Sequence, residues 1–249
     1  LKLSSRIRQN LIAVDRAEKE LILSTTQAQM DEFAAITRGV RGRMDKRIGL
    51  LRNMSDDEGK KMVEEFDKAW DAYLVVNKEV RTLTRLNSNT RATKLSKGDA
   101  RKAFDSAIGA MEDLVAKVEQ ELAQSVTRAE AVAAGNQIDL AGRINRNLVE
   151  IQRAEKNIIL ATTQEEMDVF SNDIGVINGK MQSRLDELKG QLDAEGRSLI
   201  MDFQNRFSAY TVLNKEVRDI SRENGNKRAF LLSTTEGSQL ADKAEELLM

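Results

Sequence analysis

The stretch RIRQNLIAVDRAEKELILSTTQAQMDEF, residues 6–33, returns as RINRNLVEIQRAEKNIILATTQEEMDVF at residues 143–170. The match extends without a gap, so that residues 6–96 align with residues 143–233 at an offset of 137 and roughly four positions in ten are identical. A duplicated unit longer than about 100 residues has the size of a domain rather than of a solenoid repeat. We therefore divide the chain into a first repeat, about residues 1–126, and a second, about residues 127–249.

The composition indicates an all-α protein. The 249 residues include no proline. Proline is the strongest helix breaker, and the chain is rich in Ala, Leu, Glu, Lys and Arg, so long helices are expected. With 39 basic and 40 acidic residues the formal net charge is −1. This balance argues against a polybasic protein, and we expect no nucleic-acid partner.

The chain contains no cysteine and no histidine. This absence argues against disulfides, thiol nucleophiles, structural zinc sites, histidine-ligated haem and Ser-His-Asp triads. The carboxylates are dispersed at helix-surface spacing, and nothing pairs them in a cleft. The sequence predicts a protein that is not an enzyme and that holds no metal or cofactor.

Two amphipathic helices can be placed in each repeat. The first repeat shows the apolar faces Ile7, Leu11, Val14, Leu21 and Phe66, Tyr73, Val76, Val80, Leu83, and the second shows Ile144, Leu148, Ile151, Ile158 and Phe203, Tyr210, Leu213, Val217, Ile220. Turn signals separate these helices at residues 55–59 and 193–196. Asn87 and Asn224 mark a further turn, because asparagine tolerates the left-handed region. A third helix follows each, from about Thr90 and Lys227.

The Thr-Thr-Gln sites leave two alternatives open. Thr26 with Gln29 and Thr163 with Glu166 fit capping boxes, which favours a helix break at each site. No glycine or proline stands there, and Met30 carries the apolar face onward, which favours a continuous helix. Breaks would give seven or eight helices, and continuity gives six.

We favour six helices, two long and four shorter. The long helices are expected at about Leu1–Asn53 and Thr127–Gly190, and the shorter pairs at Asp57–Leu86 with Asn89–Ala123 and Ala194–Glu223 with Asn226–Met249. A capping box at Thr127 and Glu130 places a turn near Gln124–Thr127. The architecture is then two stacked four-helix bundles that share the two long helices, with both chain ends on one side.

The ends of the sequence suggest a piece of a longer protein. The first residue is leucine, and the final KAEELLM stops inside a helical pattern. No apolar run approaches the roughly 20 residues that span a bilayer, and no signal peptide is visible. We expect any flanking transmembrane helices to lie outside this sequence.

Three motifs carry a family resemblance. RAEKNIILATTQEEM at residues 153–167, an aromatic helix that ends in NKEV at residues 214–217, and an asparagine-rich turn followed by KRAFLLS at residues 227–233 closely resemble the four-helix-bundle ligand-binding regions of bacterial methyl-accepting chemotaxis receptors. The duplicated length resembles their helical bimodular variant. The resemblance covers nearly the whole of residues 1–249 and implies the periplasmic domain of an inner-membrane receptor. Such a domain binds a small molecule, often an organic acid, works as a homodimer, and passes a small shift of its last helix to a cytoplasmic signalling region.

An organic acid needs fixed donors, and arginine offers a bidentate fork for a carboxylate. The candidate ligand-binding residues are polar positions that occur in both repeats: Arg6, Asn10, Asn77, Arg81, Arg91, Arg143, Asn147, Asn214, Arg218 and Arg228. In the stacked arrangement, Asn147, Asn77 and Arg143 are expected in one bundle. Arg6, Asn10 and Asn214 are expected in the other.

The same residues also have structural interpretations. Arginine and glutamate on bundle helices are usually solvated or paired, and Glu18 is a candidate for a salt bridge to an arginine on a neighbouring helix. Tyr73 and Tyr210 fit core positions better than a stacking cage. The charged stretch RGVRGRMDKR at residues 38–47 fits a solvated face, or a face that lines a dimer partner.

Two other functions share these features. A structural or scaffolding protein, such as a spectrin-like rod, would show the same periodicity and charge balance, although Trp70 is the only tryptophan. The sensor domain of a histidine kinase that recognises a periplasmic protein would have the same fold. The sequence identifies neither the ligand nor the output module.

Overall fold

A computed structural model describes residues 2–248, and all the regular structure in that range is helical. The elements in chain order are α1 (Lys2–Leu23), α2 (Gln27–Met54), α3 (Asp57–Leu86), α4 (Ser88–Lys97), α5 (Asp99–Gln124), α6 (Arg128–Leu160), α7 (Gln164–Gln191), α8 (Ala194–Glu223), α9 (Gly225–Leu232), the π-helical turn η1 (Ser233–Gly237) and α10 (Ser238–Glu246). At the repeat offset, α2 and α7 begin and end at equivalent positions, and so do α3 and α8. The duplication seen in the sequence is therefore a duplication of structure.

The Thr-Thr-Gln sites are helix starts, so the predicted continuous helices Leu1–Asn53 and Thr127–Gly190 are wrong. Thr26 and Thr163 have extended backbones, and their hydroxyls accept from the N–H groups of Gln29 and Glu166 at 3.3 and 3.2 Å. Each capping box satisfies free N–H groups of the new helix, and the chain turns back there without glycine or proline. The predicted turn near Gln124–Thr127 is confirmed, with Thr127 in a third capping box.

The two long segments of the fold run through Asn87 and Asn224 instead. Both asparagines lie in the left-handed region, at φ 47° and 45°, as their position in the sequence predicts. At each of these residues the chain passes from one unit into the other. The long segments are thus α3–α5, residues 57–124, and α8–α10, residues 194–246, and the prediction of two long and four shorter helical segments holds with a different assignment.

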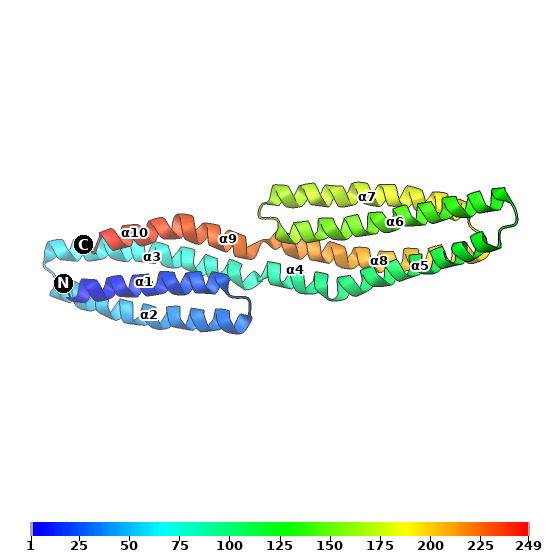
Figure 1. The fold of residues 1–249 in the computed structure, drawn as a ribbon. Coiled ribbons are helices and arrows are strands. Elements are labelled where there is room, and N and C mark those ends of the chain that lie inside the picture. The colour runs from blue at the N-terminus through cyan, green and yellow to red at the C-terminus, as the bar shows by residue number, and fades with distance from the viewer. Residues whose placement is uncertain (1, 249) are drawn as a thin grey trace. The chain divides into compact units, whose positions relative to one another are not determined.

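The chain divides into two four-helix units (Figure 1). Unit 1 comprises residues 1–88 and 224–249, and unit 2 comprises residues 89–223. Each repeat therefore gives its first three helices to one unit and its fourth helical segment to the other. Both units do share two long segments, as expected, but these are not the segments predicted. This arrangement is an exchange of the fourth helix between the two repeats.

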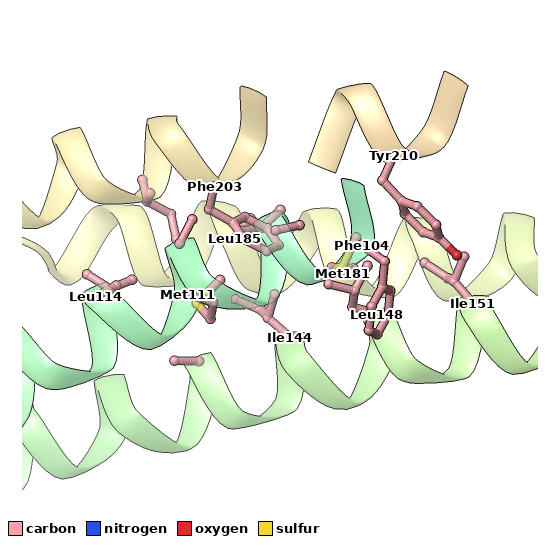
Figure 2. Packing of buried hydrophobic residues seen from close by; sticks show 14 of the residues in the cluster. Phe104, Met111, Leu114, Ile144, Leu148, Ile151, Met181, Leu185, Phe203 and Tyr210 are labelled. Carbon is pink, nitrogen blue, oxygen red and sulfur yellow. The ribbon is translucent and has the colours of Figure 1, made fainter. Parts of the chain in front are cut away.

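Unit 2 has a core of aliphatic, methionine and aromatic side chains contributed by all its helices (Figure 2). Figure 2 shows Phe104 and Met111 of the exchanged segment among Leu148 of α6 and Met181 of α7. Tyr210 is 1% exposed, as its predicted core position requires.

Unit 1 has the equivalent core. Ile7, Val14 and Tyr73 are fully buried there, which confirms the apolar faces of the first repeat. The Trp70 ring stacks on Tyr73 with centroids 5.5 Å apart. The tyrosines thus belong to the cores and do not form a ligand cage.

The two ends of the described chain lie side by side in unit 1, as six segments predict (Figure 1). The Arg8 side chain of α1 binds Glu245 of α10, with the Nε to Oε1 distance at 2.6 Å. A shift of α10 along its axis would therefore change the position of Glu245 relative to Arg8 of α1.

The exchanged helix of unit 1 starts at a close approach between backbones. A Cβ atom on Gly225 would lie 2.3 Å from the Leu83 carbonyl oxygen, so only glycine fits. The Gly225 N–H donates to the Ser88 hydroxyl at 3.0 Å. Residues 88 and 225 are equivalent positions of the two repeats, so this hydrogen bond joins the same position of each repeat.

Candidate functional site

The buried polar centre of unit 1 surrounds Glu18, which is 1% exposed. Asn77 Nδ2 of α3 donates to Glu18 Oε2 at 2.5 Å, and Ser233 Oγ of η1 donates to Oε1 at 2.5 Å. Burial raises the pKa of Glu18, and the hydrogen bonds from Ser233 and Asn77 oppose that shift. The carboxyl group therefore links α1, α3 and the exchanged helix.

Unit 2 repeats this centre around Glu155, also 1% exposed. Ser96 Oγ of α4 donates to Oε1 at 2.6 Å, and Asn214 Nδ2 of α8 donates to Oε2 at 2.7 Å. The Tyr210 hydroxyl adds a third, longer contact at 3.4 Å. Burial raises the pKa of Glu155, against the lowering effect of these donors.

Both glutamates are satisfied by protein groups, so neither is free to bind a ligand. The candidate residues Asn77 and Asn214 act in these centres, and the salt bridge considered for Glu18 is wrong because its partners are an amide and a hydroxyl. Sequence reasoning missed Ser96 and Ser233. A signal was present, since the gap-free alignment of the repeats ends at these two serines.

The helix is irregular directly after each serine. The π-helical turn η1 begins at Ser233, and α4 ends at Lys97, after which Gly98 has a non-helical backbone. A Cβ atom on Gly237, at the end of η1, would lie 3.9 Å from Glu18 Oε1. Single π-helical turns cost some stability and are often found at functional positions. In unit 1 this turn leads directly into α10, the last helix described.

A second feature of unit 2 is a cationic pocket between α6 and α7. It is lined by Arg143, Arg146, Asn147, Glu150, Lys180 and Arg184. The structure thus brings the candidates Arg143 and Asn147 together. Arg146, Lys180 and Arg184 were not among the predicted residues. The predicted continuous helix kept residues 180 and 184 far from residues 143 and 147.

The pocket is held in shape by hydrogen bonds between its own members. Arg184 donates to Asn147 Oδ1 and, at 3.5 Å, to the Arg143 carbonyl oxygen. Asn147 Nδ2 donates to Glu150 at 3.2 Å, and Arg143 forms an ion pair with Asp139 at 2.8 Å. Four cations thus line the pocket with one carboxylate, Glu150, which leaves a local excess of positive charge even with Asp139 paired to Arg143.

Unit 1 has the equivalent positions but a weaker cationic set. Arg47 donates to the Arg6 carbonyl oxygen at 3.2 Å, the counterpart of the Arg184 contact. Gln9 stands where unit 2 has Arg146, and Asn10 is buried with no partner for Nδ2 among the described residues. Arg6 and Asn10 lie in unit 1 and Asn214 in unit 2, so the predicted group of these three is wrong.

The other predicted group fails for the same reason. Asn77 lies in unit 1, whereas Asn147 and Arg143 lie in unit 2. The turns at Thr26 and Thr163 fold the second helix of each repeat back along the first, and the third helix of the same repeat packs in the same unit. Asn77 therefore meets Glu18 and not Asn147.

Arg81 belongs to a third feature, a basic pocket of unit 1 between α2 and α3. Arg38, Lys78 and Arg85 line it as well. Burial and the nearby charges of Arg38 and Arg41 lower the pKa of Arg81. Arg38 and Arg41 are exposed, as the solvated-face interpretation of residues 38–47 requires.

The remaining candidates are scattered. Arg91 forms an ion pair with Glu223 at 2.7 Å in unit 2, and Arg228 is exposed on α9 of unit 1. Arg218 has a buried Nε atom with no hydrogen-bond partner in the described part of the chain. The structure does not bring these three arginines to the cationic pocket.

No group of three or more acidic, histidine or cysteine side chains within residues 2–248 is arranged to hold a metal ion. Within the same residues, no helix is both long enough and apolar enough to cross a bilayer. Cationic side chains gather in two recesses, one between α6 and α7 of unit 2 and one between α2 and α3 of unit 1.

The chain is thus an all-helical protein of two four-helix units, each with a buried glutamate centre. The chain belongs to the four-helix-bundle sensory modules for signal transduction, whose family model matches residues 1–133 and again residues 136–249. The two matches agree with the two repeats.

Solved structures agree on the fold. The chain is similar to the sensor domain of the Vibrio parahaemolyticus histidine kinase sensor TorS, with a TM-score of 0.62, 12% identity and coverage of 99% of this chain and 95% of the other. It is also similar to the TorS sensor domain in a complex with TorT in the presence of TMAO, with a TM-score of 0.53, 10% identity and coverage of 99% and 97%. A comparison with curated proteins gives no match.

Proposed function

We propose that this sensory module is the extracytoplasmic domain of a transmembrane chemoreceptor and binds a small organic acid between α6 and α7 of unit 2. The observation that carries the proposal is the cationic pocket, where Arg143, Arg146, Lys180 and Arg184 line one recess. Guanidinium and ammonium groups bind carboxylates through charge-assisted hydrogen bonds. The module itself performs no catalysis in this proposal.

Transmission of the signal would use the buried centre of unit 1. Ser233 at the start of η1 holds Glu18 of α1, and α10 continues from the same turn. A bistable helix register is a common switching element, and a π-helical turn can absorb a small shift. We propose that a ligand-linked shift passes through η1 into α10 and on toward a cytoplasmic output region.

In this proposal the domain is periplasmic, belongs to an inner-membrane protein and acts as a homodimer, with the transmembrane helices outside this sequence. The family assignment and the resemblance to chemotaxis receptors support this assignment. Sedimentation equilibrium should show a dimer population that increases when the organic acid is present. A strict monomer at all concentrations would contradict this part of the proposal.

The binding test uses succinate and acetate as probes in isothermal titration calorimetry. Arg184→Ala is expected to weaken binding at least tenfold, because it removes both a cation and the donor that orients Asn147. Arg47→Ala, the equivalent change in unit 1, is the matched control and should leave the affinity unchanged. Equal affinity of wild type and Arg184→Ala, or no binding of any small carboxylate, would contradict the proposal.

A periplasmic protein is the second candidate ligand. The basic pocket between α2 and α3 of unit 1 favours it, because its exposed arginines suit an acidic surface better than an enclosed small molecule. The TorS sensor domain of the solved complex carries a protein partner, TorT. If Arg38→Ala and Arg41→Ala abolish receptor signalling while carboxylate binding is absent, this alternative replaces the first.

A further inference from the structure

The cationic pocket of unit 2 continues along the groove between α6 and α7 into a second recess. Glu150 and Lys180 line both recesses, so the two are contiguous. The second recess adds the apolar side chains of Ala154, Phe170 and Ile177. The groove therefore has a cationic end and an apolar end.

The antiparallel pairing of α6 and α7 sets the order of these groups. Arg184 contacts residues 143 and 147 at the cationic end, and Phe170 lies two to three helical turns before Lys180. At 1.5 Å per residue, Ile177 lies roughly 5 Å and Phe170 roughly 15 Å along the axis from Lys180. A carboxylate bound at Lys180 and Arg184 would place the next few carbon atoms of its ligand over Ile177.

The apolar end is partly exposed, although Phe170 and Ile177 also pack against the core of unit 2. Val176 is 50% exposed, and Phe170 and Ile177 are partly buried. The only charges that line this recess besides the shared pair are Arg153 and Asp173, which balance each other. A second carboxylate would gain no net attraction there, whereas an apolar body would remove half-exposed side chains from water.

The first repeat differs from the second at some of these positions. Gly39 occupies the position equivalent to Val176, and Ile36 the position equivalent to Asp173. Phe33 and its counterpart Phe170 are both half-buried, and each packs against the core of its own unit. The groove of the second repeat therefore differs from the equivalent groove at Arg146 and Val176, where the first repeat has Gln9 and Gly39.

From this groove we infer the ligand class: a monocarboxylate that carries an apolar body, such as an aromatic ring or a short alkyl chain, rather than a short dicarboxylate. The inference rests on the proposed function, because it assigns the class of acid to the same site. The carboxylate binds the cations at Lys180 and Arg184, and the apolar body covers Val176 and Ile177. Phe170 marks the far end that a longer body would reach.

The test compares acetate, succinate and phenylacetate by isothermal titration calorimetry on the whole chain. Phenylacetate is expected to bind at least tenfold more tightly than acetate or succinate. Val176→Asn should remove most of that advantage and leave acetate unchanged, because the variant makes the recess polar without touching a cation. Val212→Asn on α8, another exposed valine, is the matched control.

Each other outcome has one meaning. If acetate and succinate bind, and Arg184→Ala weakens them, but phenylacetate binds no more tightly, the inference is wrong and the proposed function stands. If phenylacetate binds more tightly but neither Val176→Asn nor Phe170→Ala reduces its affinity, the ring lies elsewhere and the inference is wrong. If no carboxylate binds although thermal melts show folded protein, the proposed function fails as well.

Discussion

The two units keep the same buried centre and differ on their surfaces. Glu18 in unit 1 and Glu155 in unit 2 each accept from an asparagine of the same repeat and a serine of the other. An unpaired buried carboxyl group is costly, so a duplicated core must preserve the glutamate and its donors together. The centres are thus better explained by the fold than by ligand binding.

The surfaces were free to diverge because solvated side chains impose little on the fold. Unit 2 has Arg146 where unit 1 has Gln9, and this arginine completes the cationic pocket. Unit 1 has Arg38 where unit 2 has Gly175, and this arginine lines the basic pocket between α2 and α3; Arg41, where unit 2 has Asn178, adds a further exposed positive charge on the same helix. This comparison indicates that candidate ligand-binding residues are best looked for at surface positions where the two repeats have different side chains.

The largest effect is expected where the two repeats meet. Gly225→Ala should destabilise the chain by about 3 kcal/mol, because its Cβ would lie 2.3 Å from the Leu83 carbonyl oxygen and α9 would be forced off α3. Urea unfolding measures the change. Gly179→Ala, which would meet nothing within 4 Å, is the control and should stabilise α7 by about 0.5–1 kcal/mol. A neutral Gly225→Ala would contradict the close approach.

The next effect separates the two glutamate centres. Asn77→Ala should cost about 3 kcal/mol, since it leaves Glu18 with the Ser233 donor alone. Asn214→Ala should cost about 2 kcal/mol, since the Tyr210 hydroxyl still contacts Glu155. Thermal and urea unfolding of both variants test the order, and equal costs would remove the role assigned to Tyr210.

The smallest effect is a dependence on pH. Burial raises the pKa of Glu18 and of Glu155 above the ordinary value of 4.5, so the folded state holds protons that the unfolded state has released. The stability contributed by each protonated carboxyl is full below about pH 4.5 and is lost as pH rises through the raised pKa. Glu18→Gln and Glu155→Gln should therefore gain stability relative to wild type as pH rises from 4.5, measured by urea unfolding. A constant difference across pH would contradict the raised pKa values.

Much of the fold could be predicted because it depends on periodicity and composition. The absence of proline and the 3.6-residue apolar spacing predict the helices, and the offset of 137 predicts the duplication. Ile7, Tyr73 and Tyr210 are buried as predicted. The left-handed conformations of Asn87 and Asn224 were also predicted, because asparagine tolerates positive φ.

The helix assignment failed where local signals were balanced. A capping box is worth about 1 kcal/mol, and an uninterrupted apolar face at Thr26 competes with it. Tertiary packing decides the outcome, because the turn lets α1 and α2 cover the same core. At Asn87 the left-handed residue stands where the chain passes into the other unit, and the local sequence does not reveal to which unit the next helix belongs.

The candidate site was predicted in part. Arg143 and Asn147 do line the cationic pocket, but Lys180 and Arg184 join them only because the chain reverses at Thr163. Ser96 and Ser233 could not be assigned to their glutamates, since each serves the other repeat. Predicting them requires the exchange of the fourth helix to be known first.

A double-mutant cycle tests that exchange most directly. Glu18→Met and Ser233→Ala, measured singly and together by urea unfolding, should show a coupling free energy of about 1–2 kcal/mol, because their side chains share a buried hydrogen bond. Glu18→Met and Ser96→Ala should be additive within about 0.5 kcal/mol. The reverse result, in which Glu18 couples to Ser96 of its own repeat and not to Ser233, would contradict the exchange of helices.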